Sequence, residues 1–311
     1  MKKNSWLILC SVLFVESLFA QVYTPHDRDA GAKYPIDTCR LLITYDFDYV
    51  VDTTTMRKYN DRTLLEIGDS INRYYSLYAD MCDSLAYNYY KDIPRTDIKR
   101  LEGGVNNDDV LKSNQIPWYF DVYTYPQRRE RVVSTRFDDT DYIYPESVEP
   151  LNWQITVQVD SILGYVCHKA IVTFRKRTWE VWFAPDLPYS FGPWKLDGLP
   201  GLILKAADTE GLFVWMAVGL ENPSHRMIHD YADKALNGLN RHPFIVPSHK
   251  KKTCKRKDLD HLWHRQWLAP LTMMFLDGEK HIIYDMSLRR EVQIDVNHVP
   301  EGYYPKLELD I

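Results

Sequence analysis

Apolar and polar residues alternate with a period of two along several stretches of the chain. Between residues 41 and 51 the odd positions carry Leu41, Ile43, Tyr45 and further apolar side chains, whereas most even positions are polar. The same alternation returns at residues 151–159. A period of two is typical of a β-strand with one buried face. Both stretches are therefore predicted to be half-buried strands.

Two hairpins are predicted where pairs of strand-like stretches flank short polar turns. The first turn is the basic triplet Arg175-Lys176-Arg177, and the second is residues 208–211. The strands of these hairpins are expected at residues 165–174, 178–184, 202–207 and 212–220. Shorter strands are expected at residues 63–67, 118–125, 132–137, 142–144, 282–285 and 292–295.

Three further stretches have helix-like patterns: residues 79–90, 225–240 and 257–276. Between the first of these and the next strand, residues 92–116 carry proline and paired glycines, which favour a surface excursion. Together the elements predict a mainly β, α+β fold, in which one curved antiparallel sheet packs against a few helices.

Residues 1–20 are typical of a secretory signal peptide. Lys2 and Lys3 precede an apolar core, Trp6 to Phe14, that is too short to span a bilayer, and a small-residue site ends at Ala20. Later stretches do not approach the length of a membrane span. We therefore expect an exported protein, periplasmic or associated with the outer membrane, that is not an integral membrane protein.

The mature chain, residues 21–311, is expected to form a single domain. Its core is predicted at about residues 39–222, followed by a C-terminal helical extension at about 223–311. The formal net charge of the whole chain is −5. A mildly acidic protein is poorly suited to general nucleic-acid binding, so this function is not expected.

One basic run stands out against this acidic background. Its cationic residues are Lys250, Lys251, Lys252, Lys255, Arg256 and Lys257. Such a patch could contact anionic lipid headgroups, lipopolysaccharide or an acidic partner. It could equally be a solvated linker between helices.

Four cysteines follow the signal peptide: Cys39, Cys82, Cys167 and Cys254. In an oxidising compartment they permit two disulfides in three connectivities, and buried free thiols with at most one bridge are the alternative. They form no Cys-x-x-Cys pair, so no structural metal site is expected.

The sequence contains no coherent catalytic constellation. His261 and His264 are three residues apart on a predicted helix and could face one metal ion, but no glutamate occupies the position of a hydrolase base. Two solvent-facing histidines are the simpler interpretation. No Gly-x-Ser-x-Gly elbow and no nucleotide-binding fingerprint occur, and we expect no cofactor.

The segment from Gly192 to Leu204 is the most distinctive part of the chain, because glycine and proline turn residues run directly into a buried strand. In a functional interpretation, the lip of a ligand groove is formed by Pro193, Trp194, Leu199 and Pro200. The alternative is a rigid turn, with Trp194 as a plug against the sheet. The glycines assigned to structural roles are Gly164, Gly192, Gly198 and Gly201.

Four blocks of sequence carry a family resemblance. They are Leu64–Gly68 with Tyr75 and Ser76, Trp153 with Gly164–Ala170, Phe174–Pro185, and Gly192–Leu204. In these blocks the chain resembles the GLPGLI family of bacterial envelope proteins, named after the motif that spans Gly198 to Ile203 here. The resemblance implies an open, half-barrel-like antiparallel sheet, akin to that of periplasmic lipoprotein carriers. The family has no firmly established activity.

The chain departs from the family pattern at Lys176, where relatives tend to have glycine. If the turn requires a positive φ, lysine costs about 1 kcal/mol relative to glycine. Lys176→Gly is then predicted to be neutral or stabilising.

These observations favour a non-catalytic envelope binding module for a hydrophobic or peptide ligand, a lipidic group or an envelope partner protein. Two alternatives stay open. One is a metal-dependent hydrolase that uses the C-terminal histidines, and the other is an accessory component of an envelope transport or secretion complex.

Overall fold

The structure is a computed structural model of the chain. It describes residues 33–53, 56–81, 84, 117–137, 140–231, 250–259, 281–285, 290–294 and 307–308.

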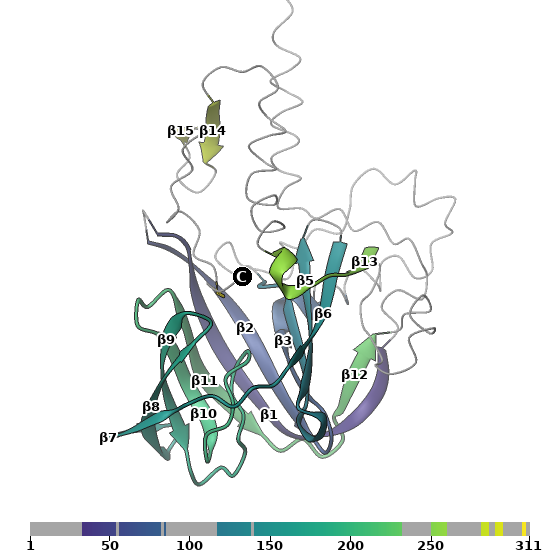
Figure 1. The fold of residues 1–311 in the computed structure, drawn as a ribbon, viewed down its shortest axis with the longest axis vertical. Helices are drawn as coiled ribbons and strands as arrows, with labels where there is room; N and C mark the ends of the chain where they lie inside the picture. The colour runs from purple at the N-terminus through teal and green to yellow at the C-terminus, as the bar shows by residue number, and fades with distance from the viewer. Residues whose placement is uncertain are drawn as a thin grey trace, which may run out of the picture.

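Thirteen strands form one large sheet (Figure 1). They are β1 (Lys33–Asp52), β2 (Arg57–Gly68), β3 (Asn72–Ser76), β4 (Phe120–Tyr125), β5 (Glu130–Phe137), β6 (Thr140–Ser147), β7 (Gln154–Ile162), β8 (Tyr165–Phe174), β9 (Arg177–Ala184), β10 (Leu202–Asp208), β11 (Phe213–Glu221), β12 (Met227–Tyr231) and β13 (Lys250–Thr253). The described residues also include the 3-10 helices η2 (Pro126–Arg128) and η3 (Arg256–Asp258), and a separate two-stranded sheet contains β14 (His281–Asp285) and β15 (Arg290–Ile294).

The large sheet is open, because its two end strands do not pair with each other. Across the sheet the order is β13-β6-β5-β4-β3-β2-β1-β11-β10-β9-β8-β7, and β12 lies off this path and pairs with β1. The strand pairs are antiparallel except β13 with β6, which is parallel. Curvature of the sheet brings its two halves toward each other (Figure 1).

Strand β1 joins these two halves. It pairs with β2 from Cys39 to Asp52 and, on its other side, with β11 from Leu42 to Tyr49. We call β2–β6 with β13 the first arm, and β7–β11 the second arm. The arms meet along β1, so residues on one side of the sheet can contact both arms.

The main core lies inside the curve of the sheet. The odd positions of β1 from Leu41 to Tyr49 are buried there together with apolar residues from both arms, such as Val133 and Val181. The Phe47 and Trp215 rings stack with centroids 4.3 Å apart, and the indole N–H of Trp215 donates to the Tyr74 hydroxyl at 2.8 Å. Because this hydrogen bond pairs the buried indole N–H, burial of the ring does not carry the free-energy cost of an unmade hydrogen bond.

The prediction of a mainly β fold with one curved antiparallel sheet is confirmed. Both predicted hairpins are present, as β8–β9 and β10–β11. The short strand expected at residues 63–67 is the C-terminal half of the longer β2, and the two C-terminal strands occur as β14 and β15.

The prediction of a half-buried strand at residues 151–159 is wrong in its burial. Strand β7 is the end of the sheet, and the exposed fractions of Ile155, Val157 and Val159 are 55%, 97% and 56%. A register shift between Ile155 and Val159 interrupts its pairing with β8. Alternation alone cannot tell whether a strand has neighbours on both sides, and bulges of this kind are common on edge strands.

The predicted helix at residues 225–240 is also corrected, because residues 227–231 form strand β12. This strand pairs with the first part of β1, from Lys33 to Thr38. The side chain of Ile228 is buried in a small cluster with Leu42 and Leu64 on the side of the sheet opposite the main core. Packing on that face favours the extended conformation over the local helical pattern.

Several sequence predictions concern residues outside those that the structure describes. They are the signal peptide at residues 1–20, the excursion at 92–116, Cys82, His261 and His264, and most of the predicted helices at 79–90 and 257–276. Among the described residues, 77–81 and 84 are helical. The 3-10 helix η3 lies at the start of the predicted helix at 257–276.

Candidate functional site

The loop between β9 and β10, residues 185–201, contains the distinctive motif and folds against the sheet; we call it the motif loop. Its backbone is fixed by hydrogen bonds from Gly198 N–H to the Ser190 carbonyl and from Leu202 N–H to the Leu187 carbonyl, both at 3.0 Å. Gly198 has a φ of +89°, and a Cβ at Gly201 would lie 2.3 Å from the Ala184 carbonyl oxygen. Both positions therefore require glycine.

Trp194 is inserted into the main core from this loop. Its exposed fraction is 3%, and its ring lies 5.5 Å from Trp179 and 6.5 Å from the parallel ring of Trp215. Pro193 and Leu199 are also buried, and of the four proposed groove residues Pro200 alone is exposed. These positions fit the plug interpretation of the motif.

A small cavity separates the motif loop from the sheet. Its volume is about 10 Å³, room for about one water molecule, and its lining includes Asn72, Arg131 and Trp194. Each of these residues has a buried N–H group without a hydrogen-bond partner in the structure: Nδ2, Nε and Nε1, respectively. A single water can accept two of these hydrogen bonds, whereas a lipid chain does not fit.

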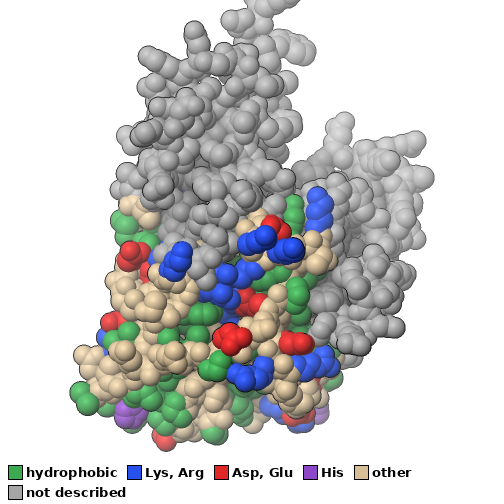
Figure 2. Space-filling view, in the orientation of Figure 1, with side chains coloured by type: hydrophobic (Ala, Val, Ile, Leu, Met, Phe, Trp, Pro, Cys, Tyr) green, Lys and Arg blue, Asp and Glu red, His purple; other side chains and the backbone are tan. Residues whose placement is uncertain are grey.

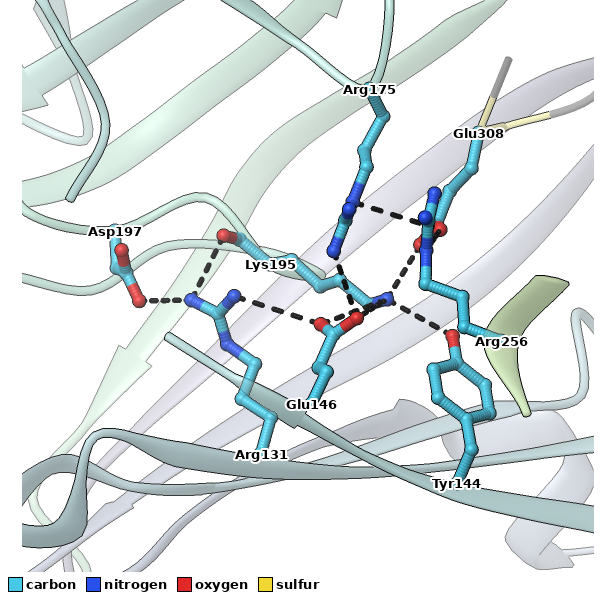
Figure 3. Close-up of polar contacts among 8 residues, drawn as sticks. All are labelled: Arg131, Tyr144, Glu146, Arg175, Lys195, Asp197, Arg256 and Glu308. Carbon is cyan, nitrogen blue, oxygen red and sulfur yellow. Dashed lines mark hydrogen bonds and ion pairs between the residues drawn. The ribbon is translucent and has the colours of Figure 1, made fainter. Parts of the chain in front are cut away.

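Next to Trp194, the side chain of Lys195 enters a polar environment (Figure 3). Its exposed fraction is 0%, and its ammonium Nζ donates to the Tyr144 hydroxyl at 3.0 Å, to Glu146 at 3.0 Å and to Glu308 at 2.5 Å. An ammonium group has three N–H donors, so all three are used. In this state Lys195 has no free donor and no lone pair for proton abstraction.

Three arginines complete the arrangement. Arg131 on β5 pairs with Asp197 of the motif loop and also donates to the Lys195 carbonyl at 3.1 Å. Arg175 donates to Glu146 at 2.9 Å, and Arg256 of η3 donates to Glu308 at 2.6 Å. We call this set the charge cluster: Arg131, Tyr144, Glu146, Arg175, Lys195, Asp197, Arg256 and Glu308 (Figure 3).

The charge cluster shifts the pKa values of its acidic members in different directions. Burial would raise the pKa of Glu308, but Lys195 and Arg256 together outweigh it and hold this pKa below its usual range. For Asp197, burial prevails over Arg131 and raises the pKa. Burial, with Glu308 and Glu146 nearby, raises the pKa of Tyr144 well above its usual value. Tyr144 therefore stays a neutral hydroxyl at ordinary pH.

On the face shown in Figure 2, Lys and Arg side chains gather near the centre beside acidic ones. Within the charge cluster, Arg175 and Arg256 are the most accessible cations, with side-chain exposures of 18% and 20%. Four cations face three carboxylates, so the cluster favours an anionic group at its accessible side. Each of its cations contacts a carboxylate, so the cluster is suited to binding anionic groups.

Sequence reasoning did not assign the charge cluster. Lys195 belongs to the motif that carries the family resemblance, and a charged residue between Trp194 and Leu196 in a segment that leads to a buried strand is a signal that could have been used. Glu308 lies 113 residues from Lys195 in sequence. Nothing local in the sequence connects these two residues.

The basic run at residues 250–257 is built into the edge of the first arm. Strand β13 pairs with β6, and the Cys254 N–H donates to the Ile143 carbonyl at 3.0 Å. The linker interpretation is therefore corrected, because parallel strand pairing fixes this backbone. Arg256 points into the charge cluster, whereas Lys252, Lys255 and Lys257 are exposed.

The cysteines in the described residues do not form disulfides. Cys39, Cys167 and Cys254 are free thiols, so the alternative of two disulfides is excluded, whereas the alternative of free thiols fits these three residues. Burial raises the pKa of Cys39 to about 12 and that of Cys254 to about 11, which keeps both as unreactive thiols. Their separate positions in the sheet could not be known from spacing.

Within the described ranges, no group of three or more His, Cys, Asp or Glu side chains is arranged to hold a metal ion. Helices of the length and apolarity needed to cross a membrane are likewise not found in this part of the chain.

No family model and no curated protein matches the chain. Among solved structures it is similar to PNGF-II in space groups P21 and C2, each with a TM-score of 0.41 and with identities of 13% and 12%. The alignments cover 80% and 79% of this chain but 35% and 34% of those chains, so it spans about a third of their length. Likeness at this level does not bear on function, and membership of the GLPGLI family stays a prediction.

Proposed function

We propose that the protein is an exported, non-catalytic binding module of the cell envelope, and that it holds a peptide segment or an envelope partner protein at the charge cluster. The observation that carries this proposal is the convergence of Lys195, Arg175 and Arg256 on one carboxylate position, beside which Arg175 and Arg256 are partly exposed. The signal-like residues 1–20 support export.

The rest of the concave side supports a polar rather than a lipidic ligand. Aromatic rings of the protein fill the space beside the cluster, with Trp194 packed against Trp179 and Trp215. The cavity under the motif loop holds about one water molecule. A segment that contacts the cluster from outside therefore fits better than an acyl chain within the sheet.

Cross-linking in the native envelope tests this function. Wild-type protein is expected to yield a defined partner by mass spectrometry, and Arg256→Met is expected to reduce the yield at least severalfold, because it removes one accessible cation. Lys257→Met is the matched control, since this neighbour in η3 is exposed and lies outside the cluster. Equal yields from wild type and Arg256→Met would contradict the proposal.

The exposed lysines of the basic run favour a second candidate function, docking on an anionic surface. Lys252, Lys255 and Lys257 form no ion pair among the described residues. Flotation with vesicles of anionic lipid tests it: wild type should bind in low salt, and the triple lysine-to-glutamine variant should not. Equal binding to neutral vesicles would exclude it.

The two other interpretations remain open to direct tests. Elemental analysis for zinc in wild type and in the His261→Ala/His264→Ala variant tests a metal-dependent hydrolase, and co-purification of a stable membrane complex tests an accessory role in transport or secretion.

A further inference from the structure

The carboxylate at the centre of the charge cluster comes from a distant part of the chain. Glu308 contacts Lys195 at 2.5 Å, Arg256 at 2.6 Å and Arg175 at 3.7 Å. The residue before it, Leu307, is buried in the main core cluster. This two-residue segment therefore places an apolar side chain and a carboxylate in two adjacent compartments of the fold.

The cations do not depend on Glu308 in equal measure. Lys195, Arg175 and Arg131 also contact Glu146, and Arg131 pairs with Asp197, whereas Arg256 contacts Glu308. Without Glu308, four cations would face two carboxylates around a buried ammonium group. An excess of positive charge in a buried site is unfavourable, so this position favours an anionic group.

The contacts that hold this segment are of the kind that a separate peptide can make. A carboxylate that accepts charge-assisted hydrogen bonds, next to one apolar side chain, needs no covalent link to the rest of the protein. Arg175 and Arg256 lie on the accessible side, so an incoming segment can reach the cations.

We propose that the charge cluster is a receptor for a segment in which an apolar residue precedes a carboxylate, and that Leu307–Glu308 is its internal occupant. An acidic partner segment binds by displacing this occupant. The inference rests on the proposed function and adds to it the chemical class of the ligand and a means of regulation by the protein's own chain.

A tethered segment competes strongly with a free one. Intramolecular binding corresponds to an effective concentration on the order of millimolar, so wild type should bind a free acidic peptide weakly. Neutralising Glu308 removes the charged contacts of the internal occupant, and a hydrogen bond to a charged group corresponds to roughly a tenfold or larger change in affinity.

The experiment uses a fluorescent peptide that copies residues 303–311 and measures anisotropy with the full chain. Glu308→Gln is expected to bind it at least about tenfold more tightly than wild type. Glu221→Gln, which neutralises an exposed carboxylate at the end of β11, is the matched control and should behave as wild type. A peptide with Gln in place of Glu308 should bind neither protein.

Two further variants keep the result decisive. Leu307→Ala loosens the occupant without altering the charges, and it replaces Glu308→Gln if that protein does not fold. Adding Arg256→Met to the variant that binds should abolish peptide binding. A folded Glu308→Gln or Leu307→Ala protein with no gain in peptide affinity overturns the inference. Partner cross-linking that still depends on Arg256 would then leave the proposed function standing, whereas loss of that dependence would remove both.

Discussion

Trp194 and Lys195 are neighbours in one turn, and their side chains enter opposite kinds of environment. The indole of Trp194 packs among aromatic rings, whereas the ammonium of Lys195 is surrounded by a hydroxyl and two carboxylates. Both side chains are almost completely buried. The turn thus fixes the motif loop by two different forces, apolar packing on one side and ion pairing on the other.

The difference between these forces is measurable. Apolar packing depends little on pH and salt, whereas a buried ion pair depends on the protonation state of each partner. Substitutions at Trp194 and at Lys195 therefore measure separately what apolar packing and ion pairing contribute to the free energy of unfolding.

Removing the indole should have the largest effect. Trp194→Ala is expected to lower the free energy of unfolding by about 3–5 kcal/mol, because it leaves a cavity among the rings. Chemical denaturation should give the same loss in low and high salt. The half-buried Trp182 is the control, and Trp182→Ala should cost clearly less. A loss at Trp194 that depended strongly on salt would contradict the packing explanation.

Lys195→Met should cost about 3 kcal/mol at neutral pH, because Glu146 and Glu308 lose their shared cation. The pKa of Glu308 is lowered in the folded protein, so the stability that this pairing provides is present above the unfolded pKa and is lost as pH falls through the folded value. The cost of Lys195→Met should therefore shrink at acidic pH. Equal costs at pH 4 and pH 7 would show that Lys195 acts by packing alone.

Asp61 sharpens the comparison, because this buried carboxyl has no cation partner among the described residues. It accepts hydrogen bonds from the Trp118 N–H at 2.8 Å and the Ser76 hydroxyl at 2.9 Å. Burial outweighs these bonds and raises the pKa of Asp61 from 3.8 to about 8.

The folded protein thus keeps this proton after the unfolded chain has lost it, so stability should fall as pH rises from about 4 to 8. The slope approaches 1.4 kcal/mol per pH unit. Asp61→Asn should remove this dependence in pH-resolved denaturation, and Asp186→Asn, at an exposed position, should leave it unchanged. The same slope in wild type and Asp61→Asn would assign it to another group.

The smallest effect is expected in the turn between β8 and β9. Arg175 and Lys176 have φ values of +55° and +59°, both in the left-handed region. Lys176→Gly should therefore stabilise the protein by about 1 kcal/mol, seen as a higher Tm. Arg175→Gly relieves the same strain but removes the ion pair with Glu146, and its Tm should fall. A lower Tm for Lys176→Gly would contradict the strain argument.

Local patterns explain which parts of the fold were predictable. The alternation in β1 and the polar turns of the two hairpins act over a few residues, and these elements were found from sequence. The exposure of Val157 depends on β7 being the last strand, and the strand conformation of residues 227–231 depends on pairing with β1. Both depend on contacts with distant parts of the chain.

The candidate site was less predictable for the same reason. The sequence singled out the motif loop and its glycines, and the structure places Trp194 as the plug that one interpretation required. The partners of Lys195 come from β6 and from the end of the described chain. Charged residues scattered through a sequence carry no local sign that they will meet.

Strand β1 has a consequence for how the chain folds. Its pairing of Leu42 with Glu221 joins residues that are very far apart in sequence, so β1 cannot connect the two arms until the chain has been synthesised as far as the end of β11. Closing such large loops before favourable contacts form makes folding slow, and intermediates expose unpaired strands meanwhile. A chaperone that shields β1 during this delay would raise the yield of native protein more than one that shields either arm.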